Sequence, residues 1–194
     1  MQQLLILRKL YDLKIVYRDI PIQNKYESSA EHSRSAMLLA DYFMGKMDLP
    51  LNRLKVFELL LYHDLAEIET GDVSLADTTD ARKNKQEAER QAMEKIVSTL
   101  PPFMGEKYQA LYEEFEAKLT PEAKFAHAMD KLDAELQCFN PPEEDREKMK
   151  EAFVPYSEEL VRQKGKYYTD YPDVEEASEK IIQFFKENGY LSEE

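Results

Sequence analysis

The chain has 194 residues, of which 39 are acidic and 26 are Lys or Arg, so its formal net charge is −13. This length predicts a single domain over residues 1–194, and the charge argues against a nucleic-acid partner, which would need a basic face. The lone Cys138, with no signal-like segment and no apolar run of membrane length, predicts a cytoplasmic protein without a membrane partner.

Residues 2–17 carry apolar side chains at helical spacing, which predicts a first helix. The sequence Ile20-Pro21 marks the end of this segment, because the residue before a proline avoids helical backbone. Arg18 lies at the boundary. From its position alone, it is interpreted as a basic residue at the C-terminal end of the helix, where the helix dipole favours a positive charge.

A capping box opens the second predicted helix. Ser28 is the expected N-cap, and Glu31 is the residue that reaches back to it. We expect the helix to end near Gly45. It places His32 in its first turn, where the positive helix end favours the neutral imidazole that a metal ligand must provide.

The most informative pattern lies in a predicted helix over residues 51–69, where His63-Asp64 is followed by Glu67. At about 100° per residue, these three side chains share one side of the helix. An adjacent histidine and aspartate can be a plain ion pair or a solvated patch. Burying two carboxylates beside a histidine is costly unless a cation balances them, and a divalent metal would do so.

The chain after this helix begins with a break at Thr70-Gly71, and Asp72 lies just past the break. Residues 73–84 are predicted to form an ordered loop, and residues 83–100 an amphipathic helix. The basic start of that helix is interpreted as a solvated face, with a basic rim beside a phosphate site as the alternative.

Two further helices are predicted over residues 105–119 and 120–138. Asp130 falls beside the apolar stripe of the second one, where an unpaired carboxylate would have its pKa raised and become neutral. Asp133 lies close to the same face and is the alternative ligand. His127 lies three residues before Asp130 and could be its partner, but an exposed histidine is the favoured interpretation.

The C-terminal residues 143–194 are predicted to form two acidic amphipathic helices. These helices can cover the core or a second subunit, which leaves a homodimer open. No alternating apolar pattern is long enough to predict a sheet. The sequence therefore predicts an all-α single domain of about seven to nine helices.

Four sequence blocks carry a resemblance to a known family. They are Glu27-Ser28-Ser29-Ala30-Glu31-His32-Ser33, His63-Asp64-Leu65-Ala66-Glu67, Gly71-Asp72 and Met129-Asp130-Lys131-Leu132. In this order and spacing they resemble the HD superfamily of metal-dependent phosphohydrolases, and they look most like the bacterial 5'-deoxynucleotidases of the YfbR type. The resemblance covers a motif core of residues 7–139. It implies an HD-type helical domain on which the helices of residues 143–194 pack.

The function implied by the resemblance is metal-dependent removal of phosphate from (deoxy)ribonucleoside 5'-monophosphates. The expected metal ligands are His32, His63, Asp64 and Asp130. These nitrogen and oxygen donors suit one divalent transition metal, Mn, Co, Fe or Zn, and leave coordination positions open for catalysis. Glu67 is expected to accept the proton of the attacking water, and Asp72 to hold the sugar or help protonate the leaving oxygen.

Further substrate contacts follow from the resemblance alone. Arg18 is expected to bind the substrate phosphate, and Ser74 and Leu75 to contact the nucleotide. The family often has a tryptophan next to the arginine, where this chain has Asp19, and the spacing from Arg18 to His32 also differs slightly.

Two alternatives stay open at this point. One is another HD phosphohydrolase acting on a cyclic nucleotide or a nucleoside triphosphate, although the short chain and the lack of a second basic cluster disfavour a triphosphate. The other is a non-catalytic, metal-stabilised helical module that binds a partner through its acidic C-terminal helices.

Overall fold

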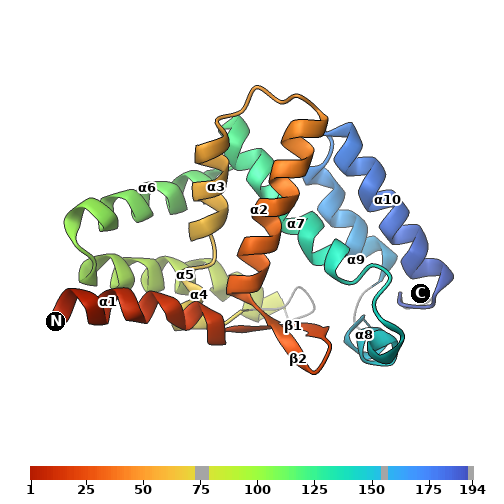
Figure 1. Ribbon diagram of the computed structural model, residues 1–194, viewed down its shortest axis with the longest axis horizontal. Coiled ribbons are helices and arrows are strands. Elements are labelled where there is room, and N and C mark those ends of the chain that lie inside the picture. The colour runs from red at the N-terminus through yellow and green to blue at the C-terminus, as the bar shows by residue number, and fades with distance from the viewer. Residues whose placement is uncertain (73–78, 154–156, 192–194) are drawn as a thin grey trace.

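Helices make up most of the computed structural model, which describes residues 1–72, 79–153 and 157–191, apart from the side chains of residues 2, 3, 79–83 and 86 (Figure 1). The helices are α1 (Gln2–Leu10), α2 (Ser29–Lys46), α3 (Arg53–Tyr62), α4 (Glu67–Thr70), α5 (Thr79–Thr99), α6 (Pro102–Ala117), α7 (Pro121–Gln137), α8 (Arg146–Phe153), α9 (Glu158–Arg162) and α10 (Pro172–Glu187). Short 3-10 helices are η1 (Tyr11–Ile15), η2 (Glu143–Asp145) and η3 (Gln163–Tyr167). Ten α-helices are present in the described residues, but α4 and α9 span only four and five residues. The predicted all-α domain of about seven to nine helices is therefore confirmed.

A small hairpin corrects the prediction for the N-terminal segment. The first helix ends at Leu10, and β1 (Tyr17–Ile22) pairs antiparallel with β2 (Lys25–Ser28), so the expectation of no sheet was wrong. Exposure along β1 alternates with a period of two until its last residues, as in a strand covered on one face. The chain reverses through Gln23, whose φ is 51°. Arg18 therefore lies in a strand and not at the end of a helix.

The predicted helix over residues 51–69 is also divided, because α3 ends at Tyr62 and α4 begins at Glu67. The Nδ1–H of His63 donates to the carbonyl of Leu60 over 2.8 Å. In a continuous α-helix that carbonyl would accept from the backbone N–H of Asp64, so the side chain competes with the helical ladder. The His63-Asp64 pair consequently lies in the turn between two helices.

The centre of the molecule is a packed group of α2, α3 and α7, with α5 and α6 toward the N-terminal end and α8 to α10 toward the C-terminal end (Figure 1). Val56, Phe125, Met129 and Phe185 belong to one apolar cluster and are fully buried. That cluster joins the motif helices to α10. Among the described residues, no helix has the length and apolar character needed to cross a membrane.

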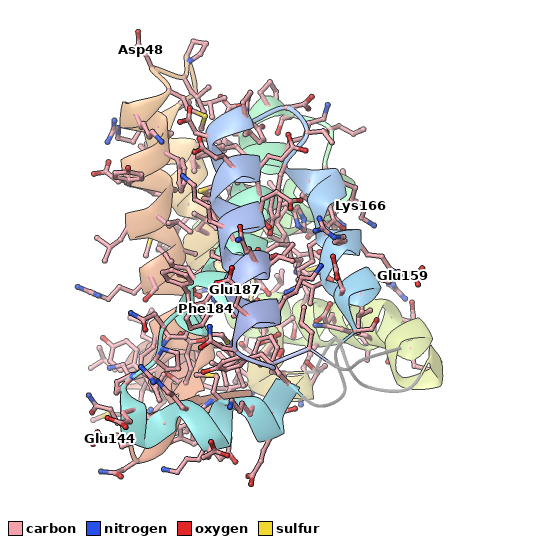
Figure 2. All side chains as sticks on the ribbon, turned by 90° about the vertical axis from the view of Figure 1, so that its right-hand side faces the viewer. Asp48, Glu144, Glu159, Lys166, Phe184 and Glu187 are labelled. Carbon is pink, nitrogen blue, oxygen red and sulfur yellow. The ribbon has the colours of Figure 1, made fainter. Side chains whose placement is uncertain are left out.

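Over its described residues, 143–153 and 157–191, the C-terminal segment contains three α-helices, α8, α9 and α10, in place of the two predicted. Figure 2 looks onto this side of the molecule, with α10 labelled at Phe184 and Glu187 and the α9–η3 segment at Glu159 and Lys166. Ion pairs join α9 to α10, between Arg162 and Glu179 at 2.6 Å and between Lys186 and Glu158 at 2.9 Å.

Candidate active site

The first turn of α2 positions His32. The predicted capping box is present, since the Ser28 hydroxyl accepts from the Glu31 N–H at 3.3 Å and the Glu31 carboxylate accepts from the Ser28 N–H at 3.0 Å. His32 is completely buried. Its Nδ1 lies 2.8 Å from a carboxylate oxygen of Asp133, and its Nε2 lies 3.1 Å from a carboxylate oxygen of Asp130. The two ring nitrogens are thus held by two acids from α7.

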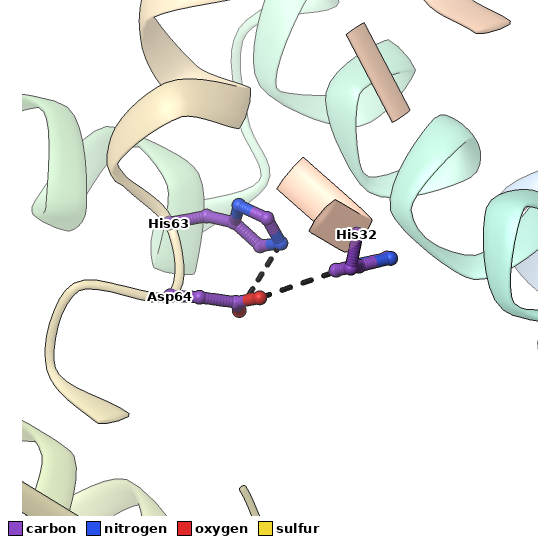
Figure 3. Close-up of side chains that lie close together, drawn as sticks. All are labelled: His32, His63 and Asp64. Atoms are coloured by element: carbon purple, nitrogen blue, oxygen red, sulfur yellow. Dashed lines mark ion pairs between the residues drawn. The ribbon is translucent and has the colours of Figure 1, made fainter. Parts of the chain in front are cut away.

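The turn after α3 presents His63 and Asp64 to the same point (Figure 3). The His63 Nε2 lies 3.1 Å from Oδ1 of Asp64 and 3.9 Å from Oδ1 of Asp130. The Oδ2 of Asp64 lies 3.9 Å from Nε2 of His32. Donor atoms from α2, from the turn and from α7 therefore converge, and the structure brings together the four side chains expected as ligands.

The donor atoms fit a metal ion because they face one another and because two of them have no hydrogen-bond partner in the described residues. A donor from each of His32, His63 and Asp64 lies within 4.8 Å of the other two. In the described part of the chain, the buried Nε2 of His63 and Oδ2 of Asp64 have no hydrogen-bond partner. Both histidines engage Nδ1 elsewhere, as metal-ligating histidines do, so that Nε2 faces the cluster. These residues could hold a divalent cation.

The charges around Asp130 explain how its buried carboxyl group stays ionised. Its Oδ2 lies 2.8 Å from the Lys131 ammonium. Burial would raise the pKa of Asp130, but Lys131 and the two nearby histidines hold it well below its usual value. Burial and Arg18 would lower the pKa of His32, but its hydrogen bonds to Asp130 and Asp133 raise it to about 9. The two acids therefore outweigh the helix end, and the neutral imidazole expected from the sequence is not the favoured form without a metal.

Glu67, the first residue of α4, is buried beside this cluster. Its carboxylate accepts a hydrogen bond from the Ser29 hydroxyl at 2.8 Å and lies 3.9 Å from the Lys85 ammonium. Burial raises the pKa of Glu67 well above its usual value, and the negative charges of Asp64 and Asp72 raise it further. A nearby cation would offset these charges and favour the ionised carboxylate, which can then accept a proton.

Arg18 reaches the cluster from β1. Its Nη1 lies 3.9 Å from Asp64, and its Nε lies 3.4 Å from the buried carboxylate of Glu27. Burial would lower the pKa of Arg18, but the nearby carboxylates outweigh it, so its guanidinium stays charged. Asp72 lines the same cavity. The remaining predicted contacts, Ser74 and Leu75, lie outside the described residues.

The cluster opens into a cavity of about 510 Å³, within the range of small-molecule sites. The cavity contains more basic residues than the sequence suggested. In addition to Arg18, it is lined by Lys85, Lys118, Lys131, Lys164 and Lys166. They come from separate segments of the chain, so the sequence alone does not group them, and acidic residues such as Glu89 and Glu116 line the cavity beside them. The start of α5 is not purely a solvated face, because Lys85 points to this cavity.

Three further acidic or histidine residues differ from what the sequence indicated. His127 is buried and not exposed; its ring stacks on Phe115 and Tyr167, and its Nε2–H donates to the Phe115 carbonyl at 3.0 Å. Asp133 contacts Nδ1 of His32, the ring nitrogen that faces away from the cluster. The three-residue spacing of Asp130 and Asp133 could not show which of the two aspartates is the ligand. Glu27 was not singled out, although it directly precedes the capping box, and no periodic signal marked it as buried.

Comparison with known proteins adds independent findings. Residues 10–173 match the HD domain family. A 5'-deoxynucleotidase HDDC2 from Xenopus laevis is 33% identical over 123 residues, which are 63% of this chain and 58% of that protein. The Homo sapiens protein of the same name is 32% identical over 63% of this chain and 57% of its own length. The chain thus matches less than two thirds of the length of these relatives.

Solved structures resemble the whole chain. A predicted metal-dependent phosphohydrolase from Magnetospirillum magnetotacticum MS-1 has a TM-score of 0.84 and 25% identity, over 99% of this chain and 95% of that one. An HD-domain phosphohydrolase from Listeria innocua has a TM-score of 0.60 and 26% identity, over 94% and 96%. The motif resemblance is confirmed, and the chain belongs to the HD domain family.

Proposed function

We propose that this protein is a metal-dependent 5'-nucleotidase that releases phosphate from deoxynucleoside 5'-monophosphates. The observation that carries the proposal is the convergence of His32, His63, Asp64 and Asp130 beside a charged arginine in a cavity. The relatives named 5'-deoxynucleotidases support the choice of substrate.

The four convergent side chains are the proposed ligands of one divalent transition metal, Mn, Co, Fe or Zn. Such an ion would supply a lowered water pKa and polarisation of the phosphoryl oxygen. Its charge would balance the acidic side chains of the cluster, which is necessary because a dianionic phosphate approaches a chain of net charge −13.

The remaining roles belong to the protein's own side chains. Arg18 binds two phosphoryl oxygens through its forked guanidinium. Glu67, fixed by the Ser29 hydroxyl, accepts the proton of the attacking water. Asp72 holds the sugar or protonates the leaving 5'-oxygen, and Ser74 and Leu75 contact the nucleotide.

A panel of phosphate esters, each assayed with each metal in turn, tests this proposal. We expect release of phosphate from deoxynucleoside 5'-monophosphates, loss of the activity with a chelator, and recovery on adding metal. Nucleoside triphosphates and cyclic nucleotides belong in the panel because the cavity lysines could bind additional phosphates. Preferred cleavage of either class, or metal binding without any cleavage, would contradict the proposed substrate.

Two expectations about the protein's setting accompany the proposal. One is a homodimer, which the exposed apolar residues of the N-terminal helix support, namely Leu4, Leu5 and Leu7; sedimentation at the mass of a monomer would refute it. The other is a cytoplasmic location, which the buried free thiol of Cys138 supports and which fractionation of cells would test.

A further inference from the structure

The cavity does not end at the metal cluster but continues along one face of α7. Asp130, Ala134 and Cys138 follow one another at intervals of four residues and all line the cavity. Residues at this spacing share one helix face. With a rise of 1.5 Å per residue, the face extends for about 12 Å from the cluster. This length is comparable with that of an extended nucleoside 5'-monophosphate.

The walls of this extension carry several apolar side chains after the first turn. We call this set the apolar arm, namely Ala134, Cys138, Met149, Ala152, Leu160 and Val161; Glu135, Gln163 and Lys164 also line the cavity. The residues of the apolar arm come from α7, α8 and α9. By contrast, the opposite end of the cavity is charged, with Lys85, Glu89, Glu116 and Lys118. An apolar wall is suited to the faces of a planar ring and not to a phosphate or to sugar hydroxyls.

One polar group at the edge of the arm is free to bind a ligand. In the residues that the structure describes, the Lys164 ammonium makes no hydrogen bond or ion pair, although it lines the cavity. Glu135, its acidic neighbour, already accepts hydrogen bonds from Tyr168 at 2.8 Å and Ser178 at 2.7 Å. Burial lowers the pKa of Lys164, and the charge of Glu135 offsets this effect only in part.

The aromatic rings of Phe115, His127 and Tyr167, which also line the cavity, are stacked on one another. Phe115 stacks on His127 with centroids 3.9 Å apart, and Tyr167 stacks on His127 at 5.6 Å. The ammonium of Lys166 lies over the Tyr167 ring at 4.9 Å. The stack therefore forms a wall of the cavity and has no open slot between its rings.

We propose that the apolar arm is the nucleobase subsite, with Ala134 leaving room for the base and Lys164 donating to a ring nitrogen or carbonyl oxygen at its edge. The inference rests on the proposed function, because it requires the phosphate to lie at the metal cluster. With the phosphate at the cluster, the sugar would place the base on the apolar arm, one to two turns of α7 from the phosphate.

The test compares a nucleotide with the same ester lacking a base. Kinetics are measured on the metal-loaded protein with thymidine 5'-monophosphate and with 2-deoxyribose 5-phosphate. The variant is Ala134→Leu, which fills the arm, and the control is Ala110→Leu at an exposed alanine of α6 outside the cavity. We expect Ala134→Leu to raise KM for the nucleotide by on the order of tenfold or more, as pocket misfits do. Its kinetics with the sugar phosphate and both activities of the control should match the unsubstituted protein.

Unchanged nucleotide kinetics in folded Ala134→Leu, or an equal loss with both substrates, would overturn the subsite. If Ala134→Leu does not fold, Ala152→Leu and Lys164→Met decide by the same comparison. If the unsubstituted protein cleaves neither compound, the proposed function fails. The arm is then judged by equilibrium dialysis of thymidine 5'-monophosphate: binding that Ala134→Leu abolishes supports it, and equal or absent binding refutes it.

Discussion

The imidazoles of His32 and His63 are oriented by partners of different kinds at Nδ1. The first contacts the Asp133 carboxylate and the second donates to the Leu60 carbonyl, each over 2.8 Å. An acceptor at Nδ1 fixes the ring and directs Nε2 to the cluster. At the residue scale, the site therefore depends on a carboxylate and a backbone carbonyl that would not themselves touch a metal.

Substitution of the two acids of α7 separates ligation from orientation. Asp130→Asn should weaken metal binding most, because it removes a charge 3.1 Å from Nε2 of His32 and leaves Lys131 without its counterion. Asp133→Asn should weaken binding by about 10–100-fold, as is typical when the partner of a ligating histidine is lost. Titration against a fluorescent chelator measures both. Unchanged binding in Asp133→Asn, or the reverse order of the two effects, would refute this division of roles.

The proton on His32 predicts how metal affinity depends on pH. Its pKa in the metal-free fold is raised to about 9, so its imidazolium stabilises that fold fully below about pH 6.5, the unfolded value, and loses this effect as pH rises through 9. A metal must displace this proton. We therefore expect affinity to rise by about tenfold per pH unit up to pH 9 for one released proton. Chelator titrations at pH 6 to 9 should show this slope, and a flat profile would contradict it.

At the scale of elements, the sequence predicted what local patterns determine. The capping box of α2 and the start of α7 depend on residues within one turn, and both are where the pattern placed them. The break between α3 and α4 was missed because the hydrogen bond from the His63 side chain to a backbone carbonyl leaves no mark in the apolar periodicity of residues 51–69. The hairpin was missed because its strands span only six and four residues, which is too short for an alternation of apolar and polar residues to stand out.

Gly71, which ends α4, gives a test at this scale. Its φ of 73° is unfavourable for a residue with a Cβ, so Gly71→Ala should lower the free energy of unfolding by about 1–3 kcal/mol. Gly45→Ala is the matched control. It lies in α2 with open space where a Cβ would be, and should stabilise the protein by about 0.4–1 kcal/mol. Urea unfolding measures both; equal effects would show that the conformation of Gly71 is not a constraint.

At the scale of the molecule, the site is assembled from segments that are distant in sequence. Arg18 comes from β1, His32 from α2, Asp64 from the turn after α3, and Asp130 from α7. The motif resemblance predicted this grouping, whereas the lysines of the cavity could be found only in three dimensions. Of these lysines, Lys164 and Lys166 lie in η3, between α9 and α10, a part of the chain for which the sequence contains no motif.

We propose that the whole chain is one cooperative domain, because a single apolar cluster includes Val56, Met129 and Phe185. Urea unfolding should then follow one transition by both circular dichroism and tyrosine fluorescence. Two separated transitions would show that the C-terminal helices form their own unit.

The central claim is that the cluster holds a metal and that Glu67 uses it to hydrolyse a nucleotide. Bound metal and phosphate release from thymidine 5'-monophosphate, measured on the same samples, test it most directly. Asp64→Ala should lose both, while Glu67→Gln should keep the metal and lose turnover by on the order of 10²–10⁴-fold, as expected for a general base. Full stoichiometric metal in Asp64→Ala, or full turnover in Glu67→Gln, would contradict the account.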